Sequence, residues 1–145
     1  MSFLSKSCVY GLRAAVYVAT HQQPERFVSI REIADNLDIS FHFLTKILQQ
    51  LTESGILRSY RGPNGGVALA RAAGEVSVKD IVDSIDGGDV FESCVLGLGG
   101  CGEKLPCPLH ASWSKERAKM KKLFERTNLQ VLARQVREKK MRLVD

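Results

Sequence analysis

The stretch Ser29 to Leu51, SIREIADNLDISFHFLTKILQQL, has the pattern of two short helices joined by a tight turn. Ser29 and Glu32 have the spacing of a capping box, in which each side chain accepts a backbone N–H at the start of a helix. Residues 36–39 then form the turn, and Ser40 can cap the second helix. The inward positions of both helices are apolar at helical spacing: Ile30, Ile33, Ala34, Leu37, Leu44, Ile47, Leu48 and Leu51. The stretch therefore predicts a helix-turn-helix.

A β-hairpin is predicted directly after this pair of helices. Gly55 ends the second helix, and residues 56–61 and 67–70 are short strand-like runs. Between them, Gly62-Pro63-Asn64-Gly65-Gly66 is a strong turn signal, because proline restricts φ and glycine frees it. An amphipathic helix over residues 3–20 precedes the whole arrangement. These elements predict a winged helix-turn-helix, whose second helix enters the major groove while the wing touches the flanking backbone.

The outward face of this predicted domain carries side chains that can reach base edges or phosphates. A plain packing unit of two helices and a strand pair is the alternative interpretation. Ser40 can equally act only as a cap, and His42 can equally be an exposed histidine without a ligand. The residues that we predict to contact DNA are Ser29, Ser40, His42, Thr45, Lys46, Gln49, Arg58, Arg61, Gly62, Asn64 and Gly65.

The second half of the chain predicts a helix over residues 78–85, a glycine-rich irregular loop, and a long helix that starts near Leu109. The charged tail from Thr127 predicts a last helix. Apolar side chains recur along the long helix at spacings that suit pairing of two subunits or an intramolecular core face: Trp113, Met120, Leu123 and Phe124. The predicted fold is thus mainly α with a small β-hairpin wing, divided into a DNA-binding domain (1–86), a loop (87–108) and a dimerisation helix with its tail (109–145).

Charge is distributed unevenly along the chain. The net charge of +5 divides into +3 over residues 1–72, −5 over residues 73–112 and +7 over residues 113–145. A positive excess suggests an anionic partner, and here it lies on both sides of an acidic middle block. No export signal or run of about 20 apolar residues is seen, so we expect a cytoplasmic protein without a membrane partner and with reduced thiols.

Three of the four cysteines lie in the acidic block, together with one histidine. Cys94, Cys101, Cys107 and His110 combine thiolates and an imidazole, the ligand types that iron in a cluster and zinc both accept. Glycines in this loop allow the thiols to gather around one point. Zinc competes with a cluster, although no closely paired C-x₂₋₄-C motif occurs. A cysteine-nucleophile enzyme is disfavoured, because no third orienting group or substrate pocket can be identified.

The chain resembles the Rrf family of bacterial winged-helix transcriptional regulators, and within it the iron-sulfur cluster regulators. The resemblance rests on residues 4–14, the helix-turn-helix over 30–51, the wing motif Arg61 to Gly66 and the loop from Cys94 to His110. It implies a homodimer that binds a pseudo-palindromic operator in double-stranded DNA and takes no small-molecule substrate. It also implies that Cys94, Cys101, Cys107 and His110 ligate a [2Fe-2S] cluster, favoured here over [4Fe-4S].

Departures from the family pattern concern the operator and the cluster. Thr45 and Lys46 replace a Glu-Gln pair of the cluster regulator, and His42 replaces a serine, so a different operator is expected; Arg61 matches a DNA-contacting arginine. The loop is one residue longer between its first two cysteines. Cys8 is interpreted first as a packed helix residue and second as a redox thiol or inter-subunit ligand. A cluster-free regulator that senses oxidants through its thiols, or binds zinc, is the alternative function, and a thiol or metal redox enzyme is a weaker one.

Overall fold

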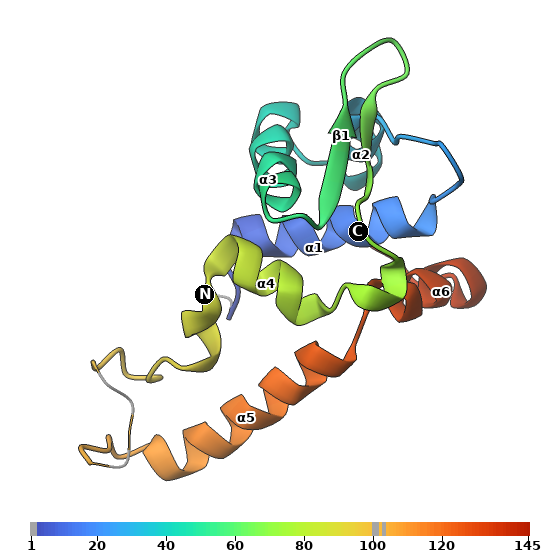
Figure 1. Cartoon of the computed structure of the whole chain (residues 1–145). Helices are drawn as coiled ribbons and strands as arrows, with labels where there is room; N and C mark the ends of the chain where they lie inside the picture. Colours follow the sequence, from blue (N-terminus) through green and yellow to red (C-terminus); the bar gives the residue numbers. More distant parts are fainter. Residues whose placement is uncertain (1–2, 100–101, 103) are drawn as a thin grey trace.

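The computed structural model of the chain describes residues 3–99, 102 and 104–145. Its elements, in chain order, are α1 (Lys6–Thr20), α2 (Ile30–Leu37), α3 (Phe41–Glu53), β1 (Leu57–Tyr60), β2 (Gly66–Leu69), the 3₁₀ turn η1 (Ala73–Glu75), α4 (Val78–Asp86), the 3₁₀ turn η2 (Gly88–Phe91), α5 (His110–Arg126) and α6 (Leu129–Lys139). The predicted mainly helical fold with a β-hairpin wing is confirmed (Figure 1).

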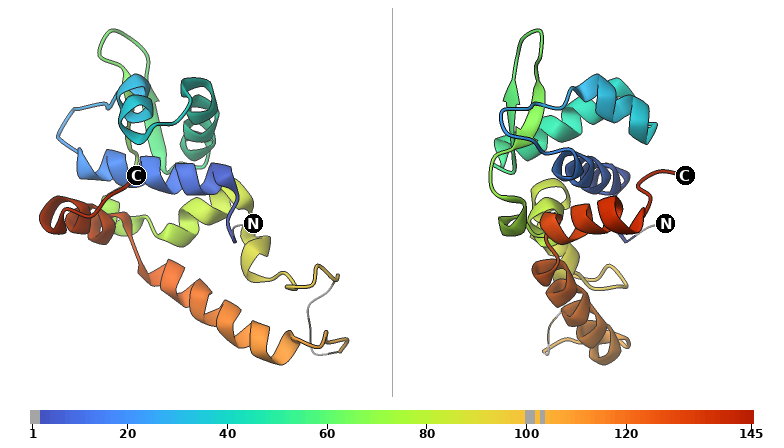
Figure 2. Two further views of the ribbon diagram at one scale, coloured as in Figure 1. Left: turned by 180° about the vertical axis from the view of Figure 1, so that it is seen from behind. Right: turned by 90° about the vertical axis from the view of Figure 1, so that its right-hand side faces the viewer.

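Helix α1 lies at the centre of the molecule. The helix-turn-helix and the wing cover one side of it, and α4 and α6 cover the other (Figures 1 and 2). Ala14, Ala15 and Val18 have no exposed surface, and the main core continues from them into α2, α3, α6 and the wing. The helix begins at Lys6 rather than at residue 3, because the Ser5 side chain accepts a hydrogen bond from the Cys8 N–H and caps the first turn.

Helices α2 and α3 form the predicted helix-turn-helix. Asp38 ends α2 in the left-handed conformation with φ of 53°, which reverses the chain, and Ile39 is buried beneath the turn. Ser40 caps α3 through a bond from the Phe43 N–H. The predicted apolar stripe of α3 is confirmed, since Leu44, Ile47, Leu48 and Leu51 are at most 1% exposed.

The capping box predicted for α2 is only half formed. Ser29 accepts the N–H of Glu32, but the Glu32 carboxylate does not return to the Ser29 backbone. It accepts hydrogen bonds from the Tyr17 hydroxyl at 2.9 Å and from Arg26 at 3.1 Å instead. Residues of α1 and the following loop thus compete for this carboxylate, which sequence spacing alone does not reveal. A complete capping box occurs at Ser77 and Asp80 of α4.

The wing is an antiparallel hairpin in which Leu57 pairs with Leu69 and Tyr60 with Gly66. Strand β1 is one residue shorter at each end than the sequence predicts, whereas β2 has the predicted length and begins and ends one residue earlier. An isolated bridge between Val28 and Val67 ties it to the segment before α2. This close approach requires glycine at position 66, where φ is 156° and a Cβ atom would overlap the Val28 carbonyl.

A second, smaller core connects α1 to the C-terminal half. Cys8, Val78, Val82 and Phe91 are buried there, and Phe124 of α5 packs on Phe91 with ring centroids 5.5 Å apart. From this contact α5 extends away from the rest of the molecule toward the cysteine loop (Figure 1). Helix α6 then returns to the main core, where Leu129 has no exposed surface. Among the described residues, no helix is long and apolar enough to cross a membrane.

We predict that Gly66→Ala lowers the free energy of unfolding by about 1–3 kcal/mol, because the added methyl group must push the wing away from the Val28 carbonyl. Urea denaturation measures the change. Gly88→Ala is the matched control, since a Cβ atom at Gly88 meets no described atom within 4 Å. Equal stability of the two variants would contradict the role assigned to Gly66.

Candidate DNA interface and cysteine loop

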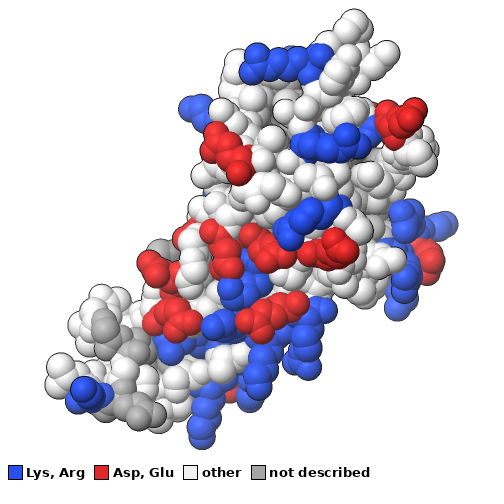
Figure 3. Space-filling model, viewed as in Figure 1, with Lys and Arg blue, Asp and Glu red and all other residues white. Residues whose placement is uncertain are grey.

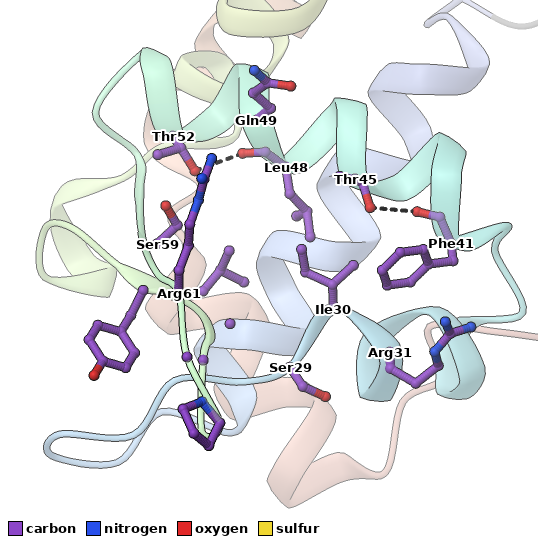
Figure 4. A pocket seen from close by; sticks show the side chains of 16 residues that line it. Ser29, Ile30, Arg31, Phe41, Thr45, Leu48, Gln49, Thr52, Ser59 and Arg61 are labelled. Carbon is purple, nitrogen blue, oxygen red and sulfur yellow. Dashed lines mark hydrogen bonds between the residues drawn. The ribbon is translucent and has the colours of Figure 1, made fainter.

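A cleft of about 650 Å³ separates the start of α2 and the face of α3 from the wing (Figure 4). The residues that line it are Ser29, Ile30, Arg31, Phe41, Thr45, Leu48, Gln49, Thr52, Ser59, Tyr60, Arg61, Gly62, Pro63, Gly65, Gly66 and Val67. Arginine supplies all the charge in this lining, which contains no aspartate or glutamate. The cleft therefore suits an anionic polymer.

Six of the predicted DNA-contacting residues line this cleft: Ser29, Thr45, Gln49, Arg61, Gly62 and Gly65. The Thr45 and Thr52 hydroxyls donate to the carbonyls of Phe41 and Leu48 within α3, each over about one helical turn. Their oxygens can still accept a hydrogen bond, whereas Gln49 is exposed and keeps both donor and acceptor for a ligand. The side of α3 that faces the wing thus carries polar groups, and part of their hydrogen-bonding capacity is used by carbonyls of the helix itself.

The remaining predicted contacts lie outside this cleft. Ser40 caps α3, His42 is exposed beside the Phe41 ring, and Asn64 is exposed at the wing tip. Lys46 lies on the other side of α3, in a second groove that Ser7 and Gln50 also line. None of these four residues lines the cleft, and their roles as DNA contacts stay predictions.

Arg58 projects from the wing onto an aromatic pair. Its guanidinium lies 4.9 Å from the centroid of the Phe27 ring, and Phe27 in turn packs against Tyr60 at 5.5 Å. Strand alternation explains this position, since Arg58 and Tyr60 share one face of β1 and Ser59 points to the other. Arg58 stabilises the wing through this contact with Phe27. Its predicted contact with DNA would be made from outside the cleft.

Sequence reasoning missed several cleft residues, above all Ile30, Arg31, Phe41, Ser59 and Tyr60. Arg31 follows the helix cap by two positions, and Phe41 follows Ser40 directly. Position relative to a cap could have indicated that both lie near a helix start. The packing of α2 against α3, which brings the two side chains together, could not be inferred from that spacing.

Acidic side chains are concentrated away from the cleft. In Figure 3 they gather at the level of α4 and α5, interspersed with lysines and arginines. Asp83 pairs with Lys79, Asp80 with Arg71, and Glu92 with Lys121. The acidic middle block of the sequence is therefore partly neutralised by neighbouring bases. Arg71, which follows the wing, does not line the cleft, and its guanidinium pairs with Asp80 instead.

The loop that follows η2 brings two of the three predicted thiol ligands together. Backbone N–H groups of Leu98 and Leu96 donate to the Cys94 sulfur, the latter at 3.4 Å, and these bonds lower the pKa of the Cys94 thiol below its ordinary value. The Cys107 side chain lies near the Cys94 thiol and contributes to lowering the pKa of that thiol. Cys94 is only 8% exposed. Cys101 lies outside the described residues.

His110 is the first residue of α5, and its backbone N–H donates to the Cys107 carbonyl at 3.0 Å. Within the described part of the chain, no three histidine, cysteine, aspartate or glutamate side chains converge as a metal site. Among the described residues, His110 therefore does not join Cys94 and Cys107 in one ligand group.

Cys8 is buried in the second core, with no exposed surface. Burial, followed by the negative charge of Asp86 and a hydrogen bond to it, raises the pKa of the Cys8 thiol to about 12. Ser5 donates to the same carboxylate through its backbone N–H and its hydroxyl. The thiol therefore packs as an apolar group, in agreement with its first interpretation.

The apolar stripe predicted for dimerisation is divided between two faces of α5. Phe124 packs on Phe91, and the Trp113 indole N–H donates to the Ser93 carbonyl at 2.9 Å. Met120 is half-buried, whereas Leu123 is 56% exposed. Part of the stripe thus forms an intramolecular core face, and Leu123 is left available to a second subunit.

The fold and the acid-free cleft define a winged helix-turn-helix regulator of the kind that binds DNA. Residues 4–135 match the family model Rrf2, described as iron-dependent transcriptional regulators, and the chain belongs to this family. The expected resemblance is thereby confirmed, and with it the expectation that the protein is a regulator and not an enzyme. Regulators of this family bind DNA and are typically dimeric.

Known proteins resemble the chain over most of its length. An HTH-type transcriptional regulator of Aquifex aeolicus is 30% identical over 125 residues, which cover 85% of each chain. The regulator IscR of Xenorhabdus nematophila is 33% identical over 104 residues, which cover 72% of this chain and 62% of that protein. The structure of CymR, the global cysteine regulator of Bacillus subtilis, superimposes with a TM-score of 0.77 at 26% identity, covering 92% of this chain and 97% of CymR.

We predict that iodoacetamide leaves Cys8 unmodified in the native protein at pH 8, because a buried thiol with a pKa of about 12 carries almost no thiolate there. Mass spectrometry of tryptic peptides measures the labelling. The unfolded protein in urea is the control, in which Cys8 reacts like the other cysteines. Rapid native labelling of Cys8 would show that the second core opens.

Proposed function

We propose that this regulator binds a pseudo-palindromic operator as a homodimer, and that an iron-sulfur cluster in the loop 87–108 controls this binding. The observation that carries the DNA-binding part is the cleft between α3 and the wing, where the charged lining residues that the structure describes are both arginines. Two subunits related by a two-fold axis would present two copies of α3 to half-sites about 34–36 Å apart.

Each side of the cleft has a distinct task in this proposal. Thr45 and Gln49 of α3 face the major groove, where amide and hydroxyl groups read base edges. Arg61, which directly follows β1, contacts the flanking backbone from the wing together with the N–H groups of the glycine-rich turn. Lys46 and His42 extend the contact beyond the cleft. The operator need not match that of IscR, because these α3 residues differ.

The cluster would be held by Cys94, Cys101, Cys107 and His110. Thiols at Cys94 and Cys107 fit this role, since the two side chains lie near each other and N–H bonds to the Cys94 sulfur stabilise the thiolate that iron requires. We favour [2Fe-2S] over [4Fe-4S], following the resemblance to IscR. A bound cluster supplies a group that responds to iron supply, redox state or nitric oxide.

The loop is connected to the DNA-binding domain through defined contacts. Phe91, just before Cys94, packs on Phe124 of α5 and lies in the same small core as Cys8 of α1. Ile47 of α3 and Ile85 of α4 both pack over Gly11 of α1. A change in the loop that moves α4 therefore has a packed route to α3, and it would shift the population of DNA-binding dimers.

The contact between Cys94 and Cys107 favours a second candidate, a cluster-free regulator that senses peroxide through its thiols. In that reaction two thiols lose two protons and two electrons to one peroxide molecule, which yields a disulfide and two waters. The likeness to CymR supports this alternative at the level of the fold and family. A cluster-free regulator that binds zinc through the same thiols is another form of this alternative. In each case we expect the regulator to act in the cytoplasm, where the DNA lies.

We predict that Arg61→Ala weakens binding to a duplex from the protein's own promoter region and to other duplexes by similar factors, because Arg61 contacts the DNA backbone from the wing. Lys46→Ala is expected to weaken binding to all duplexes alike if Lys46 contacts a phosphate. Fluorescence anisotropy at fixed salt measures both. Lys139→Ala, which removes one positive charge from the end of α6, is the control. Unchanged affinity of both test variants would remove the proposed DNA face.

We predict that anaerobic reconstitution yields a coloured protein with about two irons and two sulfides per subunit. Cys107→Ala is expected to lose the colour, and Cys8→Ala, its matched control, to keep it, since Cys8 lies in a separate core. Visible absorption together with iron and sulfide analysis measures the outcome. A colourless protein with stoichiometric zinc would contradict the cluster, and loss of colour in Cys8→Ala would assign Cys8 as a ligand.

A further inference from the structure

Arg31 occupies a defined position at the edge of the cleft. It is the second residue of α2, and its guanidinium lies 4.2 Å from the centroid of the Phe41 ring, on the first residue of α3. Phe41 is itself partly buried against the main core. A cation over an aromatic face at this distance is favourable, and stacking restricts a side chain that would otherwise move freely in solvent. The stack thus joins the two helices of the helix-turn-helix at their starts.

No carboxylate neutralises Arg31 among the residues that the structure describes. Asp35, one turn further along α2, has the spacing for an ion pair with it, yet the ion pairs of the described residues do not include this one. The neighbouring Glu32 is engaged by Tyr17 and Arg26. Arg31 therefore keeps its positive charge and remains exposed to solvent.

Arg31 and Arg61 are the two charged residues of the cleft lining, and they lie at opposite ends of it. Figure 4 shows Arg61 on the wing side near Thr52, Arg31 on the far side near Phe41, and Ile30 and Leu48 between them. A polyanion that fills the cleft would meet one cation at each end. Such spacing suits a nucleic acid backbone, which carries phosphates at regular intervals.

We propose that Arg31, held on Phe41, contacts a backbone phosphate of the bound DNA and so positions α3 in the major groove. This inference rests on the proposed DNA-binding function and assigns it a residue that sequence reasoning did not identify. The first helix of a helix-turn-helix crosses the DNA backbone, which is where Arg31 lies. A guanidinium above an aromatic ring still has N–H groups directed away from the ring, and these can donate to phosphate oxygens.

The test is the salt dependence of binding, measured by fluorescence anisotropy from low to moderate NaCl concentration. The probes are a duplex from the protein's own promoter region and a duplex of the same composition in shuffled order. Removing one phosphate contact reduces the slope of log K against log salt by about 0.9. We expect Arg31→Ala to show this smaller slope and to lose affinity by a similar factor on both duplexes.

Two matched variants separate charge from stacking. Phe41→Leu keeps an apolar side chain and the positive charge of Arg31, so it is expected to retain the wild-type slope while losing part of the affinity. Lys139→Ala removes a charge from α6 and is expected to behave like the wild type. Thermal unfolding of each variant monitors the fold, and a loss of stability alone would not alter the salt slope.

The possible results test the proposed DNA-binding function and the phosphate contact of Arg31 separately. A wild-type protein without salt-dependent DNA binding would overturn the proposed function itself. Wild-type binding together with an unchanged slope in Arg31→Ala would overturn only the phosphate contact. An affinity loss confined to the promoter duplex would instead assign Arg31 to a base, and would also overturn the phosphate contact.

Discussion

The close packing of three helices at Gly11 is the contact on which the rest of the structure depends. Ile47 of α3 and Ile85 of α4 both lie over this residue, and a side chain at position 11 would meet them. Small buried residues follow Gly11 along α1, including Ala14 and Ala15. Small residues let the helix axes approach closely, so the position of α1 determines where the other helices can lie.

This arrangement places the DNA-binding face and the cysteine loop on opposite sides of one helix. The recognition helix α3 packs on α1 through Ile47, and α4, which leads into the loop, packs on it through Ile85. The carboxylate of Asp86 at the end of α4 accepts hydrogen bonds from Ser5 at the start of α1. A displacement of the cysteine loop therefore has one of two effects. It changes the packing of α4 against α1, or the backbone of the glycines that follow α4 adjusts and α4 stays in place.

Local signals in the sequence were sufficient for the helix-turn-helix and the wing. The apolar stripe of α3, the caps at Ser29 and Ser40, and the turn between Gly62 and Gly66 all act over a few residues, so their spacing predicts them. The exceptions are long-range contacts. Glu32 pairs with Tyr17 and Arg26 rather than with the backbone of its own cap. Arg58 stacks on Phe27, which lies on a segment that precedes α2.

In the candidate sites, too, some features follow from short-range sequence signals and others depend on long-range contacts. The family, the helix-turn-helix with its wing and the set of cysteines could be predicted without coordinates, because they depend on residue type and short spacing. Three features follow from the packing of the folded chain instead: Arg31 rests on Phe41, Cys8 is enclosed beside Asp86, and Phe124 faces its own chain. The positions of these side chains depend on which helices and strands meet in the packed core. The free energy of that packing comes from contacts between residues far apart in the chain.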